Sequence, residues 1–298
     1  MSAYHHDDAP RWLTGLHEVA STHDRWVVDQ YGVLHDGIRA YPGAAEVLRR
    51  LKARGDHIVV LSNSGKRAEV NRRRLERFGF GADCVDAVLT SGELVRAMLA
   101  ARDDPFFAAL GPLCRLISND GDHGVIDGLP IQAMSSAHEA DFILLCGTGG
   151  ASLPTAFDAE FAAAARRGVP AVCANPDFLR FDGDHIVTSC GELARRYVQL
   201  GGAVRWIGKP HPEVYTRCRE LLGGVGAERI VMVGDSLLHD VAGANAAGWT
   251  SVLLTRGIHA DHLAGAGPAT MRTAQLQALC VELGLARGPH AVLDELRW

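Results

Sequence analysis

The residues that could do chemistry follow short apolar runs or strand-like segments. Trp26–Asp29 is apolar until it ends in the carboxylate of Asp29. The corresponding polar residues later in the chain are Ser62, Asn63, Lys209, Asp235 and Asp240. Carboxylates and a lysine brought to one place can hold a divalent hard cation and an anion together. A hydroxyl and free backbone N–H groups at a helix N-terminus suit a phosphoryl group. The set therefore points to a joint cation and anion site, with Asp29 as the candidate nucleophile.

Alternating strands and helices must position these residues. Apolar runs of strand length alternate with helical patterns, which predicts a parallel sheet with helices on both faces. The strands expected in this sheet are 26–29, 57–61, 87–90, 229–233 and 251–254. The expected helices are 11–20, 44–54, 67–78, 94–101, 213–222, 240–247, 274–284 and 289–296. Because loops at the carboxyl ends of parallel strands converge, we expect the polar residues to meet at one edge.

The middle of the chain has a rhythm of its own. Pro105 and Gly111-Pro112 interrupt the first pattern, and a new set of elements begins. Its expected strands are 113–117, 142–146 and 171–174, and its expected helices are 157–167 and 193–200. This set is long enough for a small α/β unit. Since the first rhythm resumes from Val204, the middle is predicted to be an insertion into one interrupted sheet domain.

Composition excludes several classes of protein. The 298 residues are 47% hydrophobic, enough for a large core, and the net charge of -5 gives no reason to expect a nucleic-acid partner. No apolar run approaches the roughly 18 residues that cross a bilayer, so no membrane partner is expected. The N-terminal residues lack the basic and apolar regions of a signal peptide. Seven cysteines without paired spacing indicate reduced thiols, hence a cytoplasmic protein.

The polar stretches, taken together, resemble the haloacid dehalogenase-like hydrolase superfamily, specifically its class IIA branch with a large inserted cap. The four matching motifs are Asp29-Gln30-Tyr31-Gly32-Val33-Leu34, Leu61-Ser62-Asn63, Gly208-Lys209-Pro210 and Gly234-Asp235-Ser236-Leu237-Leu238-His239-Asp240. The resemblance extends from about Leu13 to Gly257. It implies an α/β fold with a Rossmann-like parallel-sheet core of residues 1–92 and 203–298. It also implies an inserted α/β cap domain of residues 93–202, and a homodimer that uses this cap.

The resemblance implies a Mg²⁺-dependent phosphatase that acts on a small phosphorylated metabolite. Asp29 would attack phosphorus and form an aspartyl-phosphate, which splits hydrolysis into two steps. The implied ligands of Mg²⁺ are Asp29, Asp235 and the backbone carbonyl of Tyr31. Lys209 would neutralise charge, and Asp240 would orient the metal site or Lys209. The residues expected to bind the phosphoryl group or the rest of the substrate are Tyr31, Ser62, Asn63, Ser64, Asn175, Asp177 and Lys209.

Tyr31 departs from the pattern of the superfamily's phosphatases. They carry a second aspartate two residues after the nucleophile as general acid and base, a role worth roughly 10²–10⁴-fold in rate. His35 and Asp36 could substitute for it, or could simply belong to the loop that follows. The loss would matter least for a substrate whose leaving group departs easily.

Two other functions remain open from the sequence. The Asp-x-Tyr-Gly pattern also resembles the 2-haloacid dehalogenases, in which the aspartate attacks carbon without a metal. Asp235 argues against that alternative, because dehalogenases tend to lack this metal-binding carboxylate. A binding or regulatory protein that has lost turnover is the third alternative, which Tyr31 favours and the intact Asp29 and Lys209 oppose.

Overall fold

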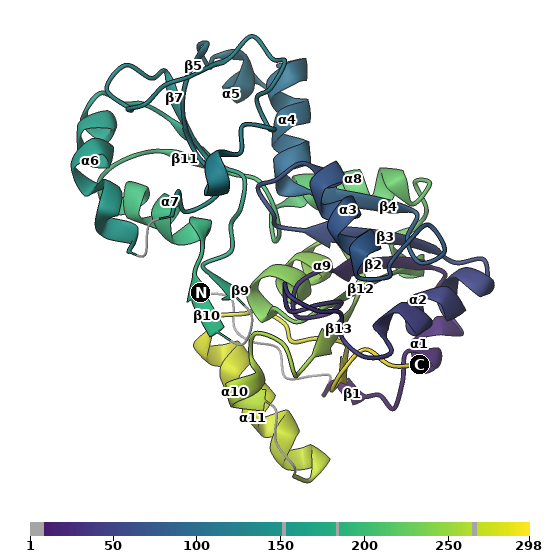
Figure 1. The fold of residues 1–298 in the computed structure, drawn as a ribbon. Coiled ribbons are helices and arrows are strands. Elements are labelled where there is room, and N and C mark those ends of the chain that lie inside the picture. The colour runs from purple at the N-terminus through teal and green to yellow at the C-terminus, as the bar shows by residue number, and fades with distance from the viewer. Residues whose placement is uncertain (1–8, 151–152, 183–184, 264–266) are drawn as a thin grey trace.

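The computed structural model describes residues 9–150, 153–182, 185–263 and 267–298. The chain forms two α/β units that lie against each other (Figure 1). No helix within the described ranges combines the length and the apolar character needed to cross a membrane.

The larger unit is built on a seven-stranded sheet in the order β1-β14-β13-β12-β2-β3-β4, and all its strand pairs are parallel. Its strands are β1 (Arg11–Trp12), β2 (Arg25–Asp29), β3 (His57–Ser62), β4 (Ala87–Thr90), β12 (Ile230–Gly234), β13 (Thr250–Leu254) and β14 (Ala291–Leu293). Strands β2 and β12 are neighbours. Strands β3 and β4, which follow β2 in the sequence, lie on one side of this pair, and β13 and β14, which follow β12, lie on the other side. This is a topological switch point, where open α/β sheets bind their ligands.

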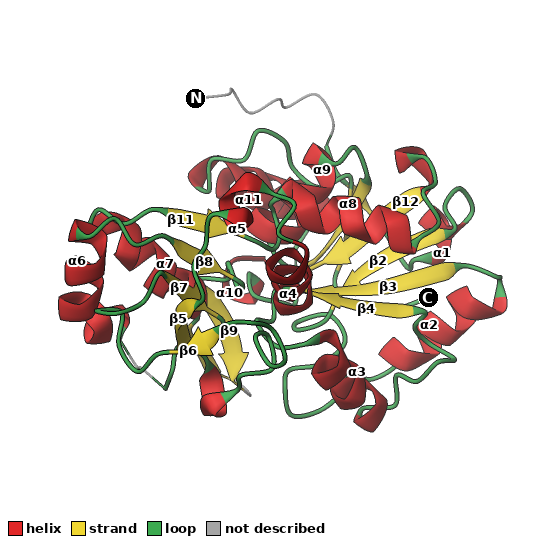
Figure 2. Cartoon of the chain, turned by 90° about the horizontal axis from the view of Figure 1, so that it is seen from above, coloured by secondary structure: helices red, strands yellow, loops and turns green. Residues whose placement is uncertain are grey.

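Helices cover both faces of this sheet, as Figure 2 shows for α2 and α3 on one side and α8 and α9 on the other. The helices of this unit are α1 (His17–Ala20), α2 (Ala44–Ala53), α3 (Ala68–Arg77), α8 (Pro212–Leu221), α9 (Ala242–Ala246), α10 (Ala260–Leu263) and α11 (Ala269–Glu282). Successive side chains of a strand point to opposite faces, so Val27 and Val28 pack into different hydrophobic clusters. Both are fully buried. Double-sided burial explains why β2 is an unbroken apolar run.

The inserted unit has a five-stranded, fully parallel sheet in the order β11-β8-β7-β5-β6. Its strands are β5 (Leu113–Ile117), β6 (Gln132–Ala133), β7 (Phe142–Leu145), β8 (Ala171–Cys173) and β11 (Val204–Trp206). Its helices are α5 (Pro105–Ala108), α6 (Asp158–Arg166) and α7 (Cys190–Gln199), and β9 (Leu179–Asp182) pairs with β10 (His185–Thr188) as an antiparallel hairpin.

Helix α4 (Ser91–Ala101) lies at the junction of the two units. Its Leu94 and Val95 belong to one hydrophobic cluster that contains Val27 of the large sheet and Phe142 of the inserted sheet. Thr90 begins the helix by accepting a hydrogen bond from the backbone N–H of Glu93. The two units therefore share a continuous apolar core through α4.

The parallel-sheet α/β fold that the sequence predicts is confirmed, but three local predictions are wrong. The stretch 289–296 was expected as a helix, whereas Ala291–Leu293 forms β14, because its side chains alternate between two buried faces. The stretch 11–20 was expected as one helix. Instead Arg11–Trp12 pairs with β14, and Arg272 packs 4.0 Å from the centre of the Trp12 ring.

The third error concerns the return of the chain from the insertion. We predicted that the core resumes at residue 203, but β11 pairs with β8 of the inserted sheet. A short strand-like sequence does not indicate which sheet it joins, because tertiary packing sets its partner strand and its register. We therefore propose that the inserted domain extends to about Trp206, with its other boundary near residue 93 as predicted.

Candidate active site

The predicted polar residues converge at the carboxyl edge of the large sheet. In the strand register Asp29 lies opposite Leu61, so Ser62 comes one residue further along β3. Val28 lies opposite Val233, which places Asp235 just beyond the neighbouring strand β12. Neighbouring strands are about 4.8 Å apart, so the three side chains meet in space. This edge forms one end of a cavity of about 540 Å³ between the two units.

Lys209 lies between two of the carboxylates. Its Nζ donates a hydrogen bond to Asp29 Oδ1 and another to Asp240 Oδ1, each at 2.6 Å. Lys209 and Asp240 are almost completely buried. Burial acts to lower the pKa of Lys209, but the charges of Asp240 and Asp29 outweigh it and raise the pKa well above its ordinary value. Lys209 is therefore a fixed positive charge beside Asp29.

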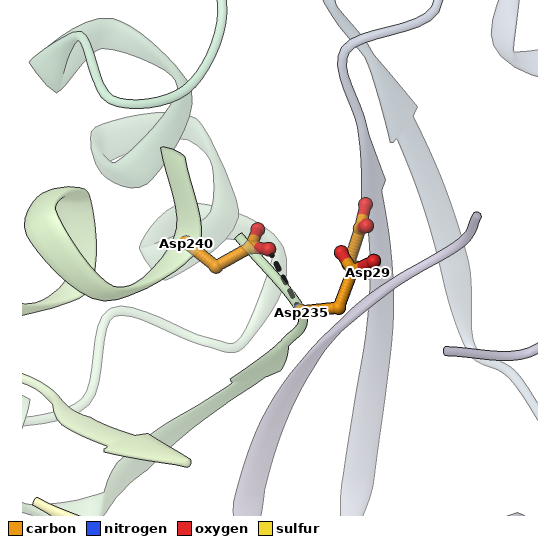
Figure 3. A group of neighbouring side chains, drawn as sticks. All are labelled: Asp29, Asp235 and Asp240. Carbon is orange, nitrogen blue, oxygen red and sulfur yellow. Dashed lines mark hydrogen bonds between the residues drawn. The ribbon is translucent and has the colours of Figure 1, made fainter. Parts of the chain in front are cut away.

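Three carboxylates, those of Asp29, Asp235 and Asp240, lie close together at this edge (Figure 3). Asp29, Asp235 and Asp240 each offer an oxygen within 4.8 Å of the other two. Burial raises the pKa of Asp29 to about 7, with Asp240 adding to the effect and Lys209 opposing it. Burial and then the charge of Asp29 raise the pKa of Asp235 well above its ordinary value. The cluster thus carries excess negative charge in a poorly solvated place, which a cation would offset.

The hydrogen bonds separate potential metal ligands from a supporting residue. Asp240 uses both oxygens within the protein, because Oδ1 faces Lys209 and Oδ2 accepts the N–H groups of Asp235 and Ser236. Asp235 Oδ2 accepts the N–H of Ile258 at 2.7 Å. Within the described ranges, no protein donor meets Asp235 Oδ1 or Asp29 Oδ2. These hard oxygen atoms fit a divalent cation such as Mg²⁺, whereas Asp240 orients Lys209 and the backbone beside it.

Two glycines lie so close to Asp235 that a side chain at either position would clash with it. A Cβ at Gly32 would lie 1.9 Å from Asp235 Oδ2, and a Cβ at Gly257 would lie 2.1 Å from the Asp235 Cβ. Gly32 also has a φ of +78°, which other residues rarely adopt. The glycine after Tyr31 therefore lets the loop that follows β2 pass directly over the carboxylate.

The loop after β3 supplies polar groups to the same cavity. Ser62 Oγ accepts the N–H of Ser64, which leaves its hydroxyl proton free for a ligand. Asn63 has a different use: its Oδ1 accepts the N–H of Lys209 at 2.7 Å, and its Nδ2 donates to the Lys209 carbonyl. Ser62, Asn63 and Ser64 all line the cavity. The structure thus places the three predicted residues together, with Asn63 fixing the backbone of Lys209.

The inserted unit contributes the opposite wall. Asn175 and Asp177 line the cavity. Asp177 Oδ1 accepts a 2.7 Å hydrogen bond from Asn63 Nδ2, and it lies 3.3 Å from Nδ1 of His239. Asn175 Oδ1 accepts the N–H of Asp177, which shapes the turn. Both predicted residues therefore lie on the wall of the cavity.

Comparison with known proteins identifies the architecture. A family model for haloacid dehalogenase-like hydrolases matches residues 26–125, and a second, HAD-hydrolase-like model matches residues 206–279. A haloacid dehalogenase-like hydrolase from Brucella suis 1330 superposes with a TM-score of 0.79 at 26% identity, covering 96% of this chain and 99% of that one. The chain belongs to the haloacid dehalogenase-like hydrolases. The α/β unit inserted between Ser62-Asn63 and Lys209 makes it a class IIA member.

The curated relatives of this chain include a protein named as a phosphatase. The D-glycerol 3-phosphate phosphatase of Mycobacterium tuberculosis is 26% identical over 247 residues, which is 82% of this chain and 66% of that protein. Human chronophin is 27% identical over 247 residues, covering 76% of this chain and 79% of chronophin. This hydrolase therefore spans about two thirds of the length of the mycobacterial relative.

Tyr31, the departure from the superfamily's phosphatase pattern, lines the cavity and accepts a hydrogen bond from Arg74 of α3. His35 and Asp36 do not replace the missing acid, because neither lines the cavity. His35 is fully buried, and burial together with Arg74 lowers its pKa to about 4. Asp36 accepts the N–H groups of Ile38 and Arg39 within its own loop. Both belong to the fold of the loop, one of the two interpretations that the sequence left open.

Sequence reasoning missed several residues of the cavity wall. His239 stands within the fourth motif, directly before Asp240, so its position was a usable signal. Arg74 had no such signal, since it is one of several arginines on α3 and only the packing of the helix selects it. The inserted unit also contributes residues to the cavity wall that the sequence did not single out, namely Asn119, Asp120, Cys146, Thr148 and Gly150.

Proposed function

We propose that this phosphoric monoester hydrolase removes phosphate from a small phosphorylated metabolite, in a Mg²⁺-dependent reaction through an aspartyl-phosphate on Asp29. The observation that supports this most strongly is the position of Lys209, which bonds Asp29 and Asp240 at the bottom of a cavity of metabolite size. The relative named as a D-glycerol 3-phosphate phosphatase points to the same reaction.

In the first step a carboxylate oxygen of Asp29 forms a bond to phosphorus while the ester P–O bond breaks. The leaving alkoxide takes a proton from solvent as it departs, and the water that attacks in the second step returns a proton to solvent. Lys209 and the Ser62 hydroxyl offset charge on the phosphoryl oxygens, since positioning and neutralisation are the main tasks in phosphoryl transfer. Mg²⁺, held by Asp29, Asp235 and the Tyr31 carbonyl, would supply the further positive charge that lets an anionic nucleophile approach a phosphate.

In the second step water attacks the phosphorus of the aspartyl-phosphate, the acyl P–O bond breaks, and inorganic phosphate leaves. The carboxylate of Asp29 is restored. The inserted unit limits the space above the phosphoryl group, and we propose that Asn175 and Asp177 contact the rest of the substrate. Asp240 holds Lys209 in register during both steps.

The two other interpretations fit the site less well. Attack on carbon without a metal leaves the buried Asp235 carboxylate without a task, although its pKa is raised by burial and by Asp29. A binding protein without turnover does not need the contact between Asp29 and Lys209. The homodimer and the cytoplasmic location that the sequence suggests stay predictions, and light scattering of the purified protein tests the first.

The test is phosphate release from a panel of phosphorylated metabolites and 4-nitrophenyl phosphate, with Mg²⁺ and with a chelator. We expect activity only with the metal. Asp29→Asn should lower kcat by roughly 10⁴-fold or more, because nucleophile removal abolishes the covalent route. Asp24→Asn is a matched control. Asp24 lies directly before the first residue of β2, at the opposite end of the strand from Asp29, and it pairs with Arg229.

Turnover that survives in Asp29→Asn would refute the nucleophile. Halide release from 2-chloropropionate without metal would favour the dehalogenase, and ligand binding without turnover on any substrate would favour a binding protein.

A further inference from the structure

Arg74 is a cation of the cavity wall for which no carboxylate partner occurs among the described residues. Its guanidinium donates a hydrogen bond to the phenolic oxygen of Tyr31 and lies 5.9 Å from the centre of that ring. A phenol is a neutral acceptor, so this contact orients the guanidinium without cancelling its charge. Arg74 is partly buried and lines the cavity together with Tyr31.

Two of the other cations of the cavity wall differ from Arg74 in their partners. Lys209 is bonded to both Asp29 and Asp240. Lys66 meets Asp120 of the inserted unit at 3.3 Å. Both charges are therefore offset within the protein, whereas the charge of Arg74 is available to a ligand.

The pair of Arg74 and Tyr31 is held in place from behind. The Tyr31 ring meets the His35 ring edge-on, with 4.5 Å between ring centres. His35 is fully buried, and its Nδ1 accepts the N–H of Gly37 at 2.9 Å. A Cβ at Gly37 would come within 3.2 Å of the Tyr31 ring, so the loop packs closely against it. A binding group fixed in this way costs little ordering when a ligand arrives.

Helix α3 connects Arg74 to the expected phosphoryl site. Asn71, three residues before Arg74 on α3, donates a hydrogen bond to Ser64 Oγ in the loop after β3. Arg74 is six residues beyond the start of α3 at Ala68, which corresponds to roughly 9 Å along the helix axis. Arg74 and Ser62 line the same cavity, so a small metabolite whose phosphate is held at Ser62 would share that cavity with Arg74.

We propose that Arg74, positioned by Tyr31, binds a second anionic group of the substrate. The enzyme then selects small phosphate monoesters that also carry a carboxylate or a second phosphate, both of which match the planar fork of arginine. This inference rests on the proposed phosphatase function. It also gives Tyr31 a role: a carboxylate at this position would offset the charge of Arg74 and repel an anionic substrate, whereas a tyrosine does neither.

Matched substrates test the inference. The first pair is 3-phosphoglycerate and glycerol 3-phosphate, which differ by a carboxylate in place of a hydroxymethyl group. The second pair is glucose 1,6-bisphosphate and glucose 6-phosphate, and 4-nitrophenyl phosphate reports basic phosphatase activity. We expect the wild type to prefer the more anionic member of at least one pair by roughly 10- to 100-fold in kcat/KM. The pair that shows the preference tells a carboxylate from a second phosphate.

Variants then assign the preference to the two residues. Arg74→Ala should abolish it mainly through a higher KM for the anionic member, and Arg74→Lys should restore part of it. Arg73→Ala is the matched control, because Arg73 is exposed, pairs with Glu69 and is not part of the cavity wall. Tyr31→Phe removes only the acceptor oxygen, so it should raise KM for the anionic member more than for its partner. Circular dichroism checks that each variant is folded.

The outcomes separate this inference from the proposed function. Turnover of 4-nitrophenyl phosphate with no preference within either pair, or a preference that survives in Arg74→Ala, overturns the role of Arg74 and leaves the phosphatase intact. An absence of turnover on every phosphate ester, 4-nitrophenyl phosphate included, means that the proposed function itself fails.

Discussion

Asn63 of the sheet domain donates a 2.7 Å hydrogen bond from its Nδ2 to Oδ1 of Asp177 in the inserted domain. The same side chain bonds both backbone groups of Lys209. The buried amide of Asn63 therefore connects Asp177 in the cavity wall to Lys209, which bonds Asp29. Its geometry links the position of Asp177 in the inserted domain to the position of Lys209.

Asn63→Ala should lower both stability and turnover. The backbone N–H of Lys209 would lose its partner in a buried place, which costs about 1–3 kcal/mol in the free energy of unfolding. We expect kcat to fall by about 10- to 100-fold, because Lys209 would no longer be held in register. Asn245→Ala is the control, since its amide also donates to backbone carbonyls, those of Arg287 and Gly288, and it is not among the residues that line the cavity. Urea unfolding and steady-state kinetics measure both effects, and an unchanged kcat in Asn63→Ala would refute the coupling.

Lys209→Met should destabilise the metal-free protein strongly. It leaves Asp29 and Asp240 buried without their cation, and breaking such a pair typically costs about 3–5 kcal/mol. Lys52→Met is a matched control, because Lys52 pairs with Asp86 nearer the surface, where an ion pair contributes about 0–1 kcal/mol. Urea unfolding of both variants in a chelator makes the comparison. Equal losses in the two variants would contradict the central position that we assign to Lys209.

Asp235→Asn separates metal binding from folding. In the metal-free protein the change removes a carboxylate that faces Asp29 under burial, so we expect an equal or higher melting temperature than in the wild type. Excess Mg²⁺ should stabilise the wild type, by about 2.7 kcal/mol at a hundred times its Kd, and should have little effect on the variant. Thermal unfolding with Mg²⁺ and with a chelator decides this. A melting temperature that Mg²⁺ shifts equally in both proteins would place the ion elsewhere.

The sequence sufficed to predict that Asp29 and Asp235 meet at one edge of the sheet, because burial on both faces leaves a clear pattern. Val27 and Val28 pack on opposite faces of the sheet, so the strand reads as an apolar run that ends at Asp29. Asp235 follows the neighbouring strand for the same reason. Where parallel strands end, their next residues meet, and no further information is needed to bring these two carboxylates together.

Features that depend on tertiary contacts could not be predicted from the sequence pattern. The run Val204–Trp206 suits either sheet, and only its pairing with β8 assigns it to the inserted unit. Arg74 is selected from its helix by the direction of a side chain toward Tyr31. The short strand β14 was mistaken for a helix, since its three apolar residues are too few to distinguish the two periods.

The acid stability of the junction between α3 and α4 depends on Glu93. Its carboxylate accepts hydrogen bonds from Arg67 and from the N–H of Ala68, and the bond with Arg67 is the main cause of its lowered pKa. A pKa that is lower in the folded state stabilises the protein above the ordinary value of 4.5, and this contribution is lost as the pH falls below it. The free energy of unfolding of Glu93→Gln should therefore fall less steeply between about pH 5 and pH 3 than that of the wild type. Urea unfolding across this range tests it, and parallel pH profiles would contradict it.

Tyr31→Asp tests whether the missing carboxylate limits the chemistry. The variant regains a group that can protonate a departing alkoxide, so kcat on glycerol 3-phosphate, a poor leaving group, should rise by roughly 10²–10⁴-fold. On 4-nitrophenyl phosphate the gain should be small, because its leaving group needs no proton. The same carboxylate should reduce any preference for 3-phosphoglycerate, since it offsets Arg74. Tyr31→Asn, which has the same size without the acid, is the matched control. If Tyr31→Asp and Tyr31→Asn behave alike on glycerol 3-phosphate, another group already donates the proton.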